Sequence, residues 1–214
     1  MNLVEYFARH HGEILRATLE HIWLVGAAML LAIAVGVPLG IVVARRPFLS
    51  KFILGGANIA ETIPSLALFG FLLPVPWLGA RAERLAVAAL LLYALLPIIR
   101  NTAAGIAGVN KSVREAARGM GMTDSQILWR VELPLSFSTM IAGIRVATVL
   151  TIGVATIAAA IGAGGLGEFI FRGLAMVNNQ VILAGAVPAA LLALIADFAL
   201  GRLERRLGSL RARS

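Results

Sequence analysis

The stretch AAMLLAIAVGVPLGIVVA, residues Ala27–Ala44, contains no charged side chain and decides the class of fold. A helix needs about 20 apolar residues to cross the hydrocarbon core of a bilayer. Together with its flank from Ile22, this stretch meets that length, and four more apolar stretches follow it along the chain. The sequence therefore predicts an all-α integral membrane protein with about five transmembrane helices: Ile22–Ala44, Phe52–Leu73, Leu85–Ile99 with its flanks, Phe137–Ile161 and Val181–Leu200.

Composition supports a lipid environment. Of the 214 residues, 59% are hydrophobic and 14% are charged, whereas a soluble domain has about a quarter of its residues charged. The net charge of +8 comes from basic residues that flank apolar spans, which argues against nucleic-acid binding. The chain has no cysteine, so neither a disulfide framework nor a thiolate metal site is expected. Residues 1–20 are mixed polar without a small-residue cleavage site, which predicts no cleavable signal peptide.

Basic residues predict the orientation, because cytoplasmic loops hold an excess of lysine and arginine. Thirteen of these residues fall after spans one and three and in the tail, five fall on the other side, and Arg145 lies within a span. This places the N-terminus outside and the C-terminus inside, with Trp23 and Trp77 as anchors at the outer interface. The thirteen are Arg45, Arg46, Lys51, Arg100, Lys111, Arg114, Arg118, Arg130, Arg202, Arg205, Arg206, Arg211 and Arg213.

One long segment, residues 101–133, lies outside the predicted spans, on the basic and therefore cytoplasmic side. Ser112 with Glu115, and Thr123 with Gln126, have the spacing of capping boxes that begin helices. Gly119 and Gly121 between them permit a turn that ends the first helix. We name residues 112–130 the elbow and expect two short helices joined by a sharp bend. An alternative is an amphipathic segment on the membrane surface, with Ile127, Leu128 and Trp129 in the interface.

The elbow resembles a known motif. Glu115-Ala-Ala, Gly121 after three residues, then Val131-x-Leu133-Pro134 is similar to the EAA loop of bacterial ATP-binding-cassette (ABC) importer permeases, with Val131 in place of the usual isoleucine. In that family the loop is the coupling helix, which sits in a cleft of the ATPase subunit. The resemblance implies a single transmembrane domain over residues 1–214, with a core at 19–205 and a coupling loop at 101–134. The implied coupling residues are Glu115, Ala116, Ala117, Gly119, Gly121, Leu133 and Pro134.

Three further stretches resemble the permeases for glycine betaine, carnitine and choline, the osmoprotectant branch of the methionine-permease-like fold. They are ETIPSLAL from Glu61, LYALLPIIRNT from Leu92 and IGAGGLGEFI from Ile161. In this family a glutamine is common at the position of Glu61, so substrate preference stays open. The resemblance implies a multi-pass transporter subunit of the bacterial cytoplasmic (inner) membrane. Such a subunit is not an enzyme, has no cofactor, and works with an ABC ATPase subunit and a substrate-binding protein. Five spans enclose a path poorly, so a second permease subunit, identical or paralogous, is expected.

Ionisable side chains at membrane depth are costly and mark functional sites by default. Glu61 and Arg145 lie roughly 12–14 Å from the cytoplasmic ends of their spans at about 1.5 Å per residue, and equal depth predicts a salt bridge between them. A purely structural pair and a translocation role both remain open. The candidate translocation residues are Glu61, Thr62, Pro64, Ser65, Asn101 and Arg145, with Thr102 and Pro97 nearby. Asp197 is expected to pair with basic residues of the tail.

Several motifs have a plainer interpretation. Gly162, Gly164 and Gly167 match a dinucleotide fingerprint, but no strand is predicted before them, so a turn on the outer side is expected. Residues 165–177 are apolar enough to form a short re-entrant or interfacial segment. The stretch GIAGVNKS from Gly105 lacks a P-loop glycine. His10, His11 and His21 lack metal-binding spacing. Gly36 and Gly40 predict close helix packing.

Two other classes of protein remain as alternatives. A secondary transporter or channel subunit predicts an inverted repeat with broken helices, and a membrane scaffold leaves Glu61 and Arg145 without a role. Within the ABC importers, an amino-acid or methionine importer is the alternative to an osmoprotectant importer.

Overall fold

The computed structural model describes residues 3–211, and these residues contain helices and no strand. The predicted tail residue Arg213 lies outside them. Four helices are long and apolar enough to cross a membrane, and a bent pair makes a fifth candidate span. The prediction of an all-α membrane fold with about five spans is therefore confirmed.

The longest helix, α1 (Leu3–Arg45), continues well beyond the predicted first span. At about 1.5 Å per residue its 43 residues exceed the roughly 30 Å of a bilayer core. Its first part, which showed no apolar run, is helical and changes direction at His10, where the backbone leaves helical geometry. Tyr6, Ile14 and Ala17 of this part are buried against α9 (Gly167–Ala175) and α10 (Asn179–Arg211).

The second predicted span is broken. Helix α2 (Pro47–Thr62) and helix α3 (Ser65–Leu72) meet at an angle of 106°. Pro64 stands between them and has no N–H to continue the helical hydrogen bonds. The hydroxyl of Tyr93 donates to the carbonyl of Ile63, which the break leaves without a helical partner. Such breaks are tolerated at membrane depth where a neighbouring helix satisfies the backbone. The short helix α4 (Pro76–Gly79) follows.

Helix α5 (Ala82–Ala107) forms the centre of the bundle and contacts α1, α2, α3, α4 and α8 (Leu133–Ala155). Its inward face carries Ala86, Ala89 and Ala94, whose small side chains allow close approach. The predicted glycine contact is confirmed here: a Cβ on Gly36 would lie 2.8 Å from Ile98, and one on Gly40 would lie 2.5 Å from Thr102. Thr102 is thus buried in helix packing and does not line a path.

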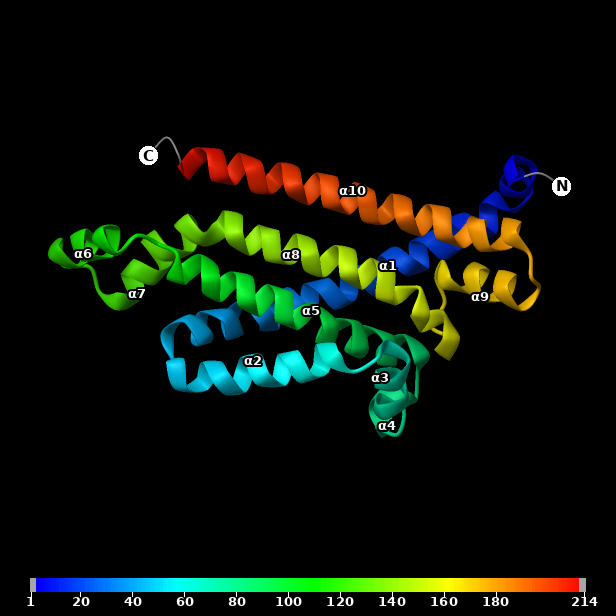
Figure 1. Ribbon diagram of the computed structural model, residues 1–214, viewed down its shortest axis with the longest axis horizontal. Coiled ribbons are helices and arrows are strands. Elements are labelled where there is room, and N and C mark those ends of the chain that lie inside the picture. Colours follow the sequence, from blue (N-terminus) through cyan, green and yellow to red (C-terminus); the bar gives the residue numbers. More distant parts are fainter. Residues whose placement is uncertain (1–2, 212–214) are drawn as a thin grey trace.

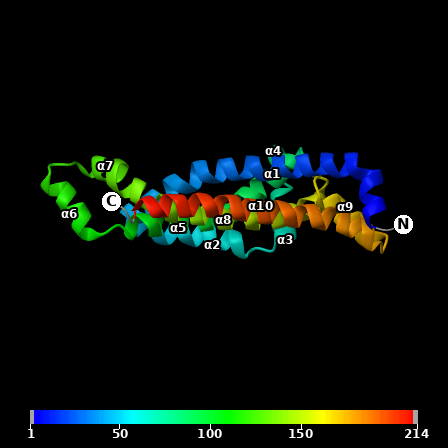
Figure 2. The same ribbon diagram turned by 90° about the horizontal axis from the view of Figure 1, so that it is seen from above.

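The chain's two ends lie at opposite ends of the elongated bundle (Figure 1). At one end, which we name the elbow end, α6 (Lys111–Gly119) and α7 (Asp124–Ile127) project beyond the spans, near the last turns of α10. At the other end lie the start of α1, helix α9 and the 3₁₀ turn η2 (Ile157–Ile161). Seen from above, α1 runs along one flank of the bundle, beside α5, α8 and α10 (Figure 2).

Candidate functional site

The first helix of the elbow is capped two residues earlier than predicted, by Asn110 instead of Ser112. The side-chain oxygen of Asn110 accepts from the backbone N–H of Ser112 at 3.0 Å and from its hydroxyl at 2.9 Å. Ser112 therefore donates to Asn110, two residues earlier, instead of capping the helix, and the predicted Ser112–Glu115 capping box is wrong. Glu115 instead lies 3.6 Å from the amine of Lys111, one turn back on the exposed surface.

The bend after α6 follows the prediction. Gly121 has φ +81°, a left-handed conformation that favours glycine. Its N–H donates to the carbonyl of Arg118, and the N–H of Met122 donates to that of Ala117, which is the Schellman pattern. The capping box of Thr123 and Gln126 that begins α7 is confirmed. Two short helices therefore meet at a defined turn, stabilised by local hydrogen bonds.

The residues of the EAA-like motif divide into two groups. Glu115, Ala116, Gly119, Gly121 and Pro134 are exposed, whereas Ala117 and Leu133 are buried. Leu133 packs with Ile106 and Met140 at the elbow end of the bundle. Both alanines are among the implied coupling residues, but the side chain of Ala117 faces the interior of this chain and only Ala116 is open to a partner.

A π-helical turn, η1 (Leu128–Glu132), joins the elbow to α8. Pro134 has no N–H and lies in the first turn of α8. In a regular α-helix its ring would clash with the carbonyl of Arg130, four residues earlier. The N–H of Leu133 instead reaches back to the carbonyl of Leu128, five residues away. Such single wide turns occur often at functional sites.

Arg145 does not pair with Glu61, so that prediction is wrong. Its Nε lies 2.6 Å from Oδ1 of Asp197, its Nη2 lies 3.1 Å from Oδ2, and its Nη1 lies 3.1 Å from a carboxylate oxygen of Glu204. The depth of a residue in a span fixes its level but not the face on which it lies. Arg145 faces α10, whereas Glu61 is on α2, which lies on the opposite side of α5 in Figure 1.

The acidic partners of Arg145 share one stripe of α10. Asp197 and Glu204 are two helical turns apart, and Gly201 lies between them. A Cβ on Gly201 would lie 3.1 Å from Nη1 of Arg145, so the glycine leaves room for the guanidinium. Asp197 thus pairs with an intramembrane arginine, and the expectation that it pairs with the basic tail is wrong. The three charged side chains are 33%, 44% and 28% exposed and line a groove of about 390 Å³ between α8 and α10.

The other candidate translocation residues are dispersed over the bundle. Glu61, Thr62, Pro64 and Ser65 lie at the break between α2 and α3, where the Thr62 hydroxyl donates to the carbonyl of Ile59 at 2.8 Å. Asn101 lies between α5 and α8, and its amide donates to the carbonyl of Pro97 at 2.9 Å. A Cβ on Gly143 of α8 would overlap the Asn101 side chain. The structure therefore does not gather the six residues at one point.

The glycine-rich stretch near the other end forms a backbone turn. Gly162, Gly164 and Gly165 all have positive φ, and helical segments flank the stretch. The N–H of Gly165 donates to Glu20 of α1 at 3.3 Å. The next residue of α1, His21, is fully buried and bonds the carbonyl of Ile152 at 3.1 Å. The glycines thus serve a turn that contacts α1, as predicted for a turn rather than a dinucleotide site.

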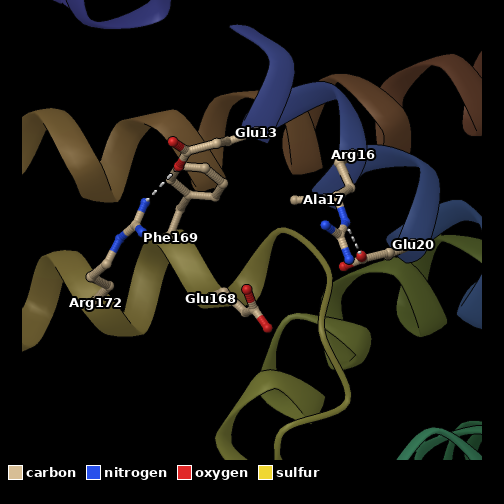
Figure 3. A pocket seen from close by; sticks show the side chains of 7 residues that line it. All are labelled: Glu13, Arg16, Ala17, Glu20, Glu168, Phe169 and Arg172. Atoms are coloured by element: carbon tan, nitrogen blue, oxygen red, sulfur yellow. Dashed lines mark hydrogen bonds and ion pairs between the residues drawn. The ribbon is translucent and has the colours of Figure 1, made fainter. Parts of the chain in front are cut away.

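A polar pocket of about 330 Å³ opens beside this turn, between α1 and α9 (Figure 3). Arg172 of α9 reaches Glu13 of α1 at 3.7 Å, and within α1 Arg16 bonds Glu20 at 3.0 Å. Phe169 lies against Arg172.

His10 and His11 bond carbonyls of their own helix, and residues 3–211 hold no group of three potential metal-binding side chains.

Sequence reasoning missed the most buried carboxylate at the elbow end, that of Glu132, which is 3% exposed. It pairs with Arg45 at the end of α1 and with Arg114 of α6, the latter at 3.6 Å. The signal was present in the sequence, because Glu132 is an acidic residue between Val131 and Leu133 at the start of a span. The rule applied to Glu61 and Arg145, that such a charge needs a partner, applies equally to this carboxylate.

The chain resembles known proteins over nearly its whole length. The family described as "Binding-protein-dependent transport system inner membrane component" matches residues 36–209. The carnitine transport permease protein OpuCB of Listeria monocytogenes is 45% identical over 96% of this chain and 93% of its own. The choline transport system permease protein OpuBB of Bacillus subtilis is 42% identical over 96% and 94%. A solved structure of the MetNI methionine ABC transporter has a TM-score of 0.84 at 22% identity, over 93% of this chain and 98% of that chain, which shows the fold.

Proposed function

The chain belongs to the family of binding-protein-dependent transport system inner membrane components, and on this premise we propose that it imports quaternary ammonium osmoprotectants such as carnitine, choline and glycine betaine. The observation that carries the proposal is the set of relatives, which are 41–45% identical over almost the whole chain and are named as permeases for these compounds. Membership of the family confirms the prediction of a transporter subunit that is not an enzyme. A separate ATPase subunit and a substrate-binding protein are its partners.

The elbow is the proposed contact with the ATPase. It extends beyond the spans, its turn is held by local hydrogen bonds, and Glu115 and Ala116 lie exposed on it. These features support a rigid segment that moves as a unit when nucleotide binding closes the ATPase pair. A ligand shifts a conformational equilibrium only through different affinities for the two states. The elbow is therefore proposed to differ in its position against the ATPase between inward- and outward-facing states.

A second permease subunit, identical or paralogous, is proposed to complete the path. The groove that holds Arg145, Asp197 and Glu204 supports this, since partly exposed charges at membrane depth normally face water or another protein rather than lipid. Residues 1–214 are proposed to form one transmembrane domain, with a core at 19–205. The translocation role of Glu61, Thr62, Pro64, Ser65 and Asn101 remains a proposal.

Uptake into liposomes tests the function. The chain reconstituted with its ATPase and binding protein is expected to take up labelled glycine betaine, carnitine or choline only when ATP is present on the side of the membrane that carries the ATPase. Glu115→Lys and Gly121→Val are expected to lower uptake roughly tenfold or more, a coupling effect of ordinary size. The first reverses an exposed charge, and the second forces a β-branched residue into positive φ.

Gly26→Val is the control for these variants, because Gly26 is helical with open space around it. Uptake that proceeds without ATP, or that ignores both elbow variants, would contradict the coupling role and favour a secondary transporter. ATP-dependent uptake of methionine in place of the quaternary amines would show that the chain belongs to a methionine importer instead.

The proposed orientation places the N-terminus outside and the elbow inside. The chain has no cysteine of its own, so single cysteines report on each side without background. Ala80→Cys and Ser112→Cys alter exposed positions at the two ends of the bundle. In intact cells a membrane-impermeant maleimide is expected to label position 80 and spare position 112. Inverted vesicles are expected to give the reverse, and the same pattern in both preparations would refute the orientation.

A further inference from the structure

We propose that Glu132 is a positioning residue, which fastens the elbow to the ends of α1 and α5 so that these helices follow the elbow when it moves. The inference rests on the proposed coupling function and adds to it the residue through which the motion passes into the bundle. Glu132 does not touch the exposed surface offered to a partner, since only 3% of its side chain is exposed.

The carboxylate joins elements that are far apart in the sequence. One oxygen accepts from Nη2 of Arg45, the last residue of α1. The other oxygen lies 3.6 Å from Nε of Arg114 in α6. Glu132 itself is the last residue of the π-helical turn before α8. A single buried side chain thus connects α1, the elbow and the start of α8.

Arg114 extends the same network to α5. Its Nη2 lies 2.9 Å from the carbonyl of Ala107 and 2.6 Å from that of Val109, at and just beyond the end of α5. These carbonyls have no further helical N–H to accept from, and a cation at a helix C-terminus is favourable. The elbow is therefore attached to α5 through Arg114 and to α1 through Glu132.

The two ion pairs of Glu132 differ in closeness. The pair with Arg45 is a direct hydrogen bond, whereas 3.6 Å to Arg114 exceeds hydrogen-bond range. Nε of Arg114 is buried without a hydrogen-bond partner. A small rotation of α6 about its axis therefore shortens or breaks the contact with Arg114, while the contact with Arg45 keeps Glu132 on α1. A cavity of about 340 Å³ lined by both arginines and Glu132 leaves room for that movement.

Energetics explain why the helices move together. A buried carboxylate that loses its partners is strongly unfavourable, far more so than the pair is favourable. Glu132 follows the elbow by two residues, so if the elbow drew it away while α1 stayed, the carboxylate would be left buried without Arg45. It keeps this partner when α1 shifts with the elbow. This is a two-state element that nucleotide binding biases from a distance.

The test compares Glu132→Gln, which keeps the shape and removes the charge, with Glu132→Asp, which keeps the charge. In the reconstituted complex, Glu132→Gln is expected to keep basal ATP hydrolysis. Two quantities are expected to fall roughly tenfold: the stimulation of ATP hydrolysis by glycine-betaine-loaded binding protein, and glycine betaine uptake. Glu132→Asp is expected to recover part of both. Glu83→Gln, an exposed carboxylate near the start of α5, is the matched control and is expected to behave as wild type.

Two outcomes overturn the role of Glu132 without overturning the proposed function. The first is stimulation and uptake by Glu132→Gln within about twofold of wild type, a ratio too small for coupling. The second is an equal loss of basal and stimulated hydrolysis, which a purely structural role gives. If Glu132→Gln fails to insert, Arg45→Gln/Glu132→Gln removes the unpaired charge on α1 and is expected to insert but remain unstimulated. Wild type without any ATP-dependent uptake overturns the proposed function itself, and the role of Glu132 with it.

Discussion

Gly167→Ala is expected to destabilise the folded chain by about 3 kcal/mol, the upper part of the usual range for inserting a methyl group where there is no room. A Cβ at this position would overlap the backbone carbonyl of Thr156 and lie 2.8 Å from the Cβ of Ala159. Since the overlapped atom belongs to the backbone, no change of side-chain rotamer relieves the clash. The 3₁₀ turn η2 and the start of α9 must separate instead.

The measurement is the thermal midpoint of detergent-solubilised protein, followed by size-exclusion chromatography after heating. Gly167→Ala is expected to lower it by roughly 10 °C. Gly153→Ala is the matched control, because Gly153 is in α8 with nothing within 4 Å of a Cβ. Alanine favours a helix there, so its midpoint is expected to stay or rise. Equal midpoints for the two variants would show that η2 and α9 are not packed as described.

The same comparison separates two interpretations of the glycine-rich stretch. A dinucleotide fingerprint uses its glycines to let a cofactor approach, so their replacement would impair binding more than folding. In this chain three glycines have positive φ and the fourth meets a backbone carbonyl. Their replacement is therefore expected to impair folding itself, with or without any ligand.

Hydropathy and local motifs predicted much of the fold. The apolar runs located the spans, and Thr123 with Gln126 located the start of α7, because a capping box depends only on residues three apart. The same local reasoning failed at Ser112, where Asn110 competes for the backbone N–H. Pro64 indicated a break in the second span, because proline interrupts helical hydrogen bonding. The angle of 106° between α2 and α3 was not indicated, since hydropathy counts apolar residues and does not report direction.

Partners across helices were the part that the sequence alone left undetermined. Depth along a span is computed from residue number, but which neighbour a side chain faces depends on how the helices pack. One signal was available: Asp197, Gly201 and Glu204 lie on one stripe of α10, because residues three and four apart share a helix face. Asp197 lies within the fifth predicted span and Glu204 lies four residues beyond its end. Two acids on one stripe predict a basic partner, and Arg145 is the basic residue within a predicted span.

Arg145→Asp is expected to reduce ATP-dependent uptake roughly tenfold or more, because it places three carboxylates together at membrane depth. In the wild-type chain, Arg145 bonds both oxygens of Asp197 and one of Glu204. A paired, bidentate geometry of this kind fixes α8 against α10 as well as neutralising charge. Both the amount of inserted protein and the uptake per inserted molecule are therefore expected to fall.

Two double variants decide which residue is the partner. Arg145→Asp/Asp197→Arg returns a basic and an acidic group to the facing positions and is expected to regain much of the lost insertion and uptake. Arg145→Glu/Glu61→Arg exchanges charges between α8 and α2 and is expected to regain neither, since Arg145 faces α10. Rescue through Glu61 and not through Asp197 would mean that the helices repack in the assembled transporter. Rescue through Asp197 alone would show that the pairing of Arg145 with α10 is kept in the complete transporter.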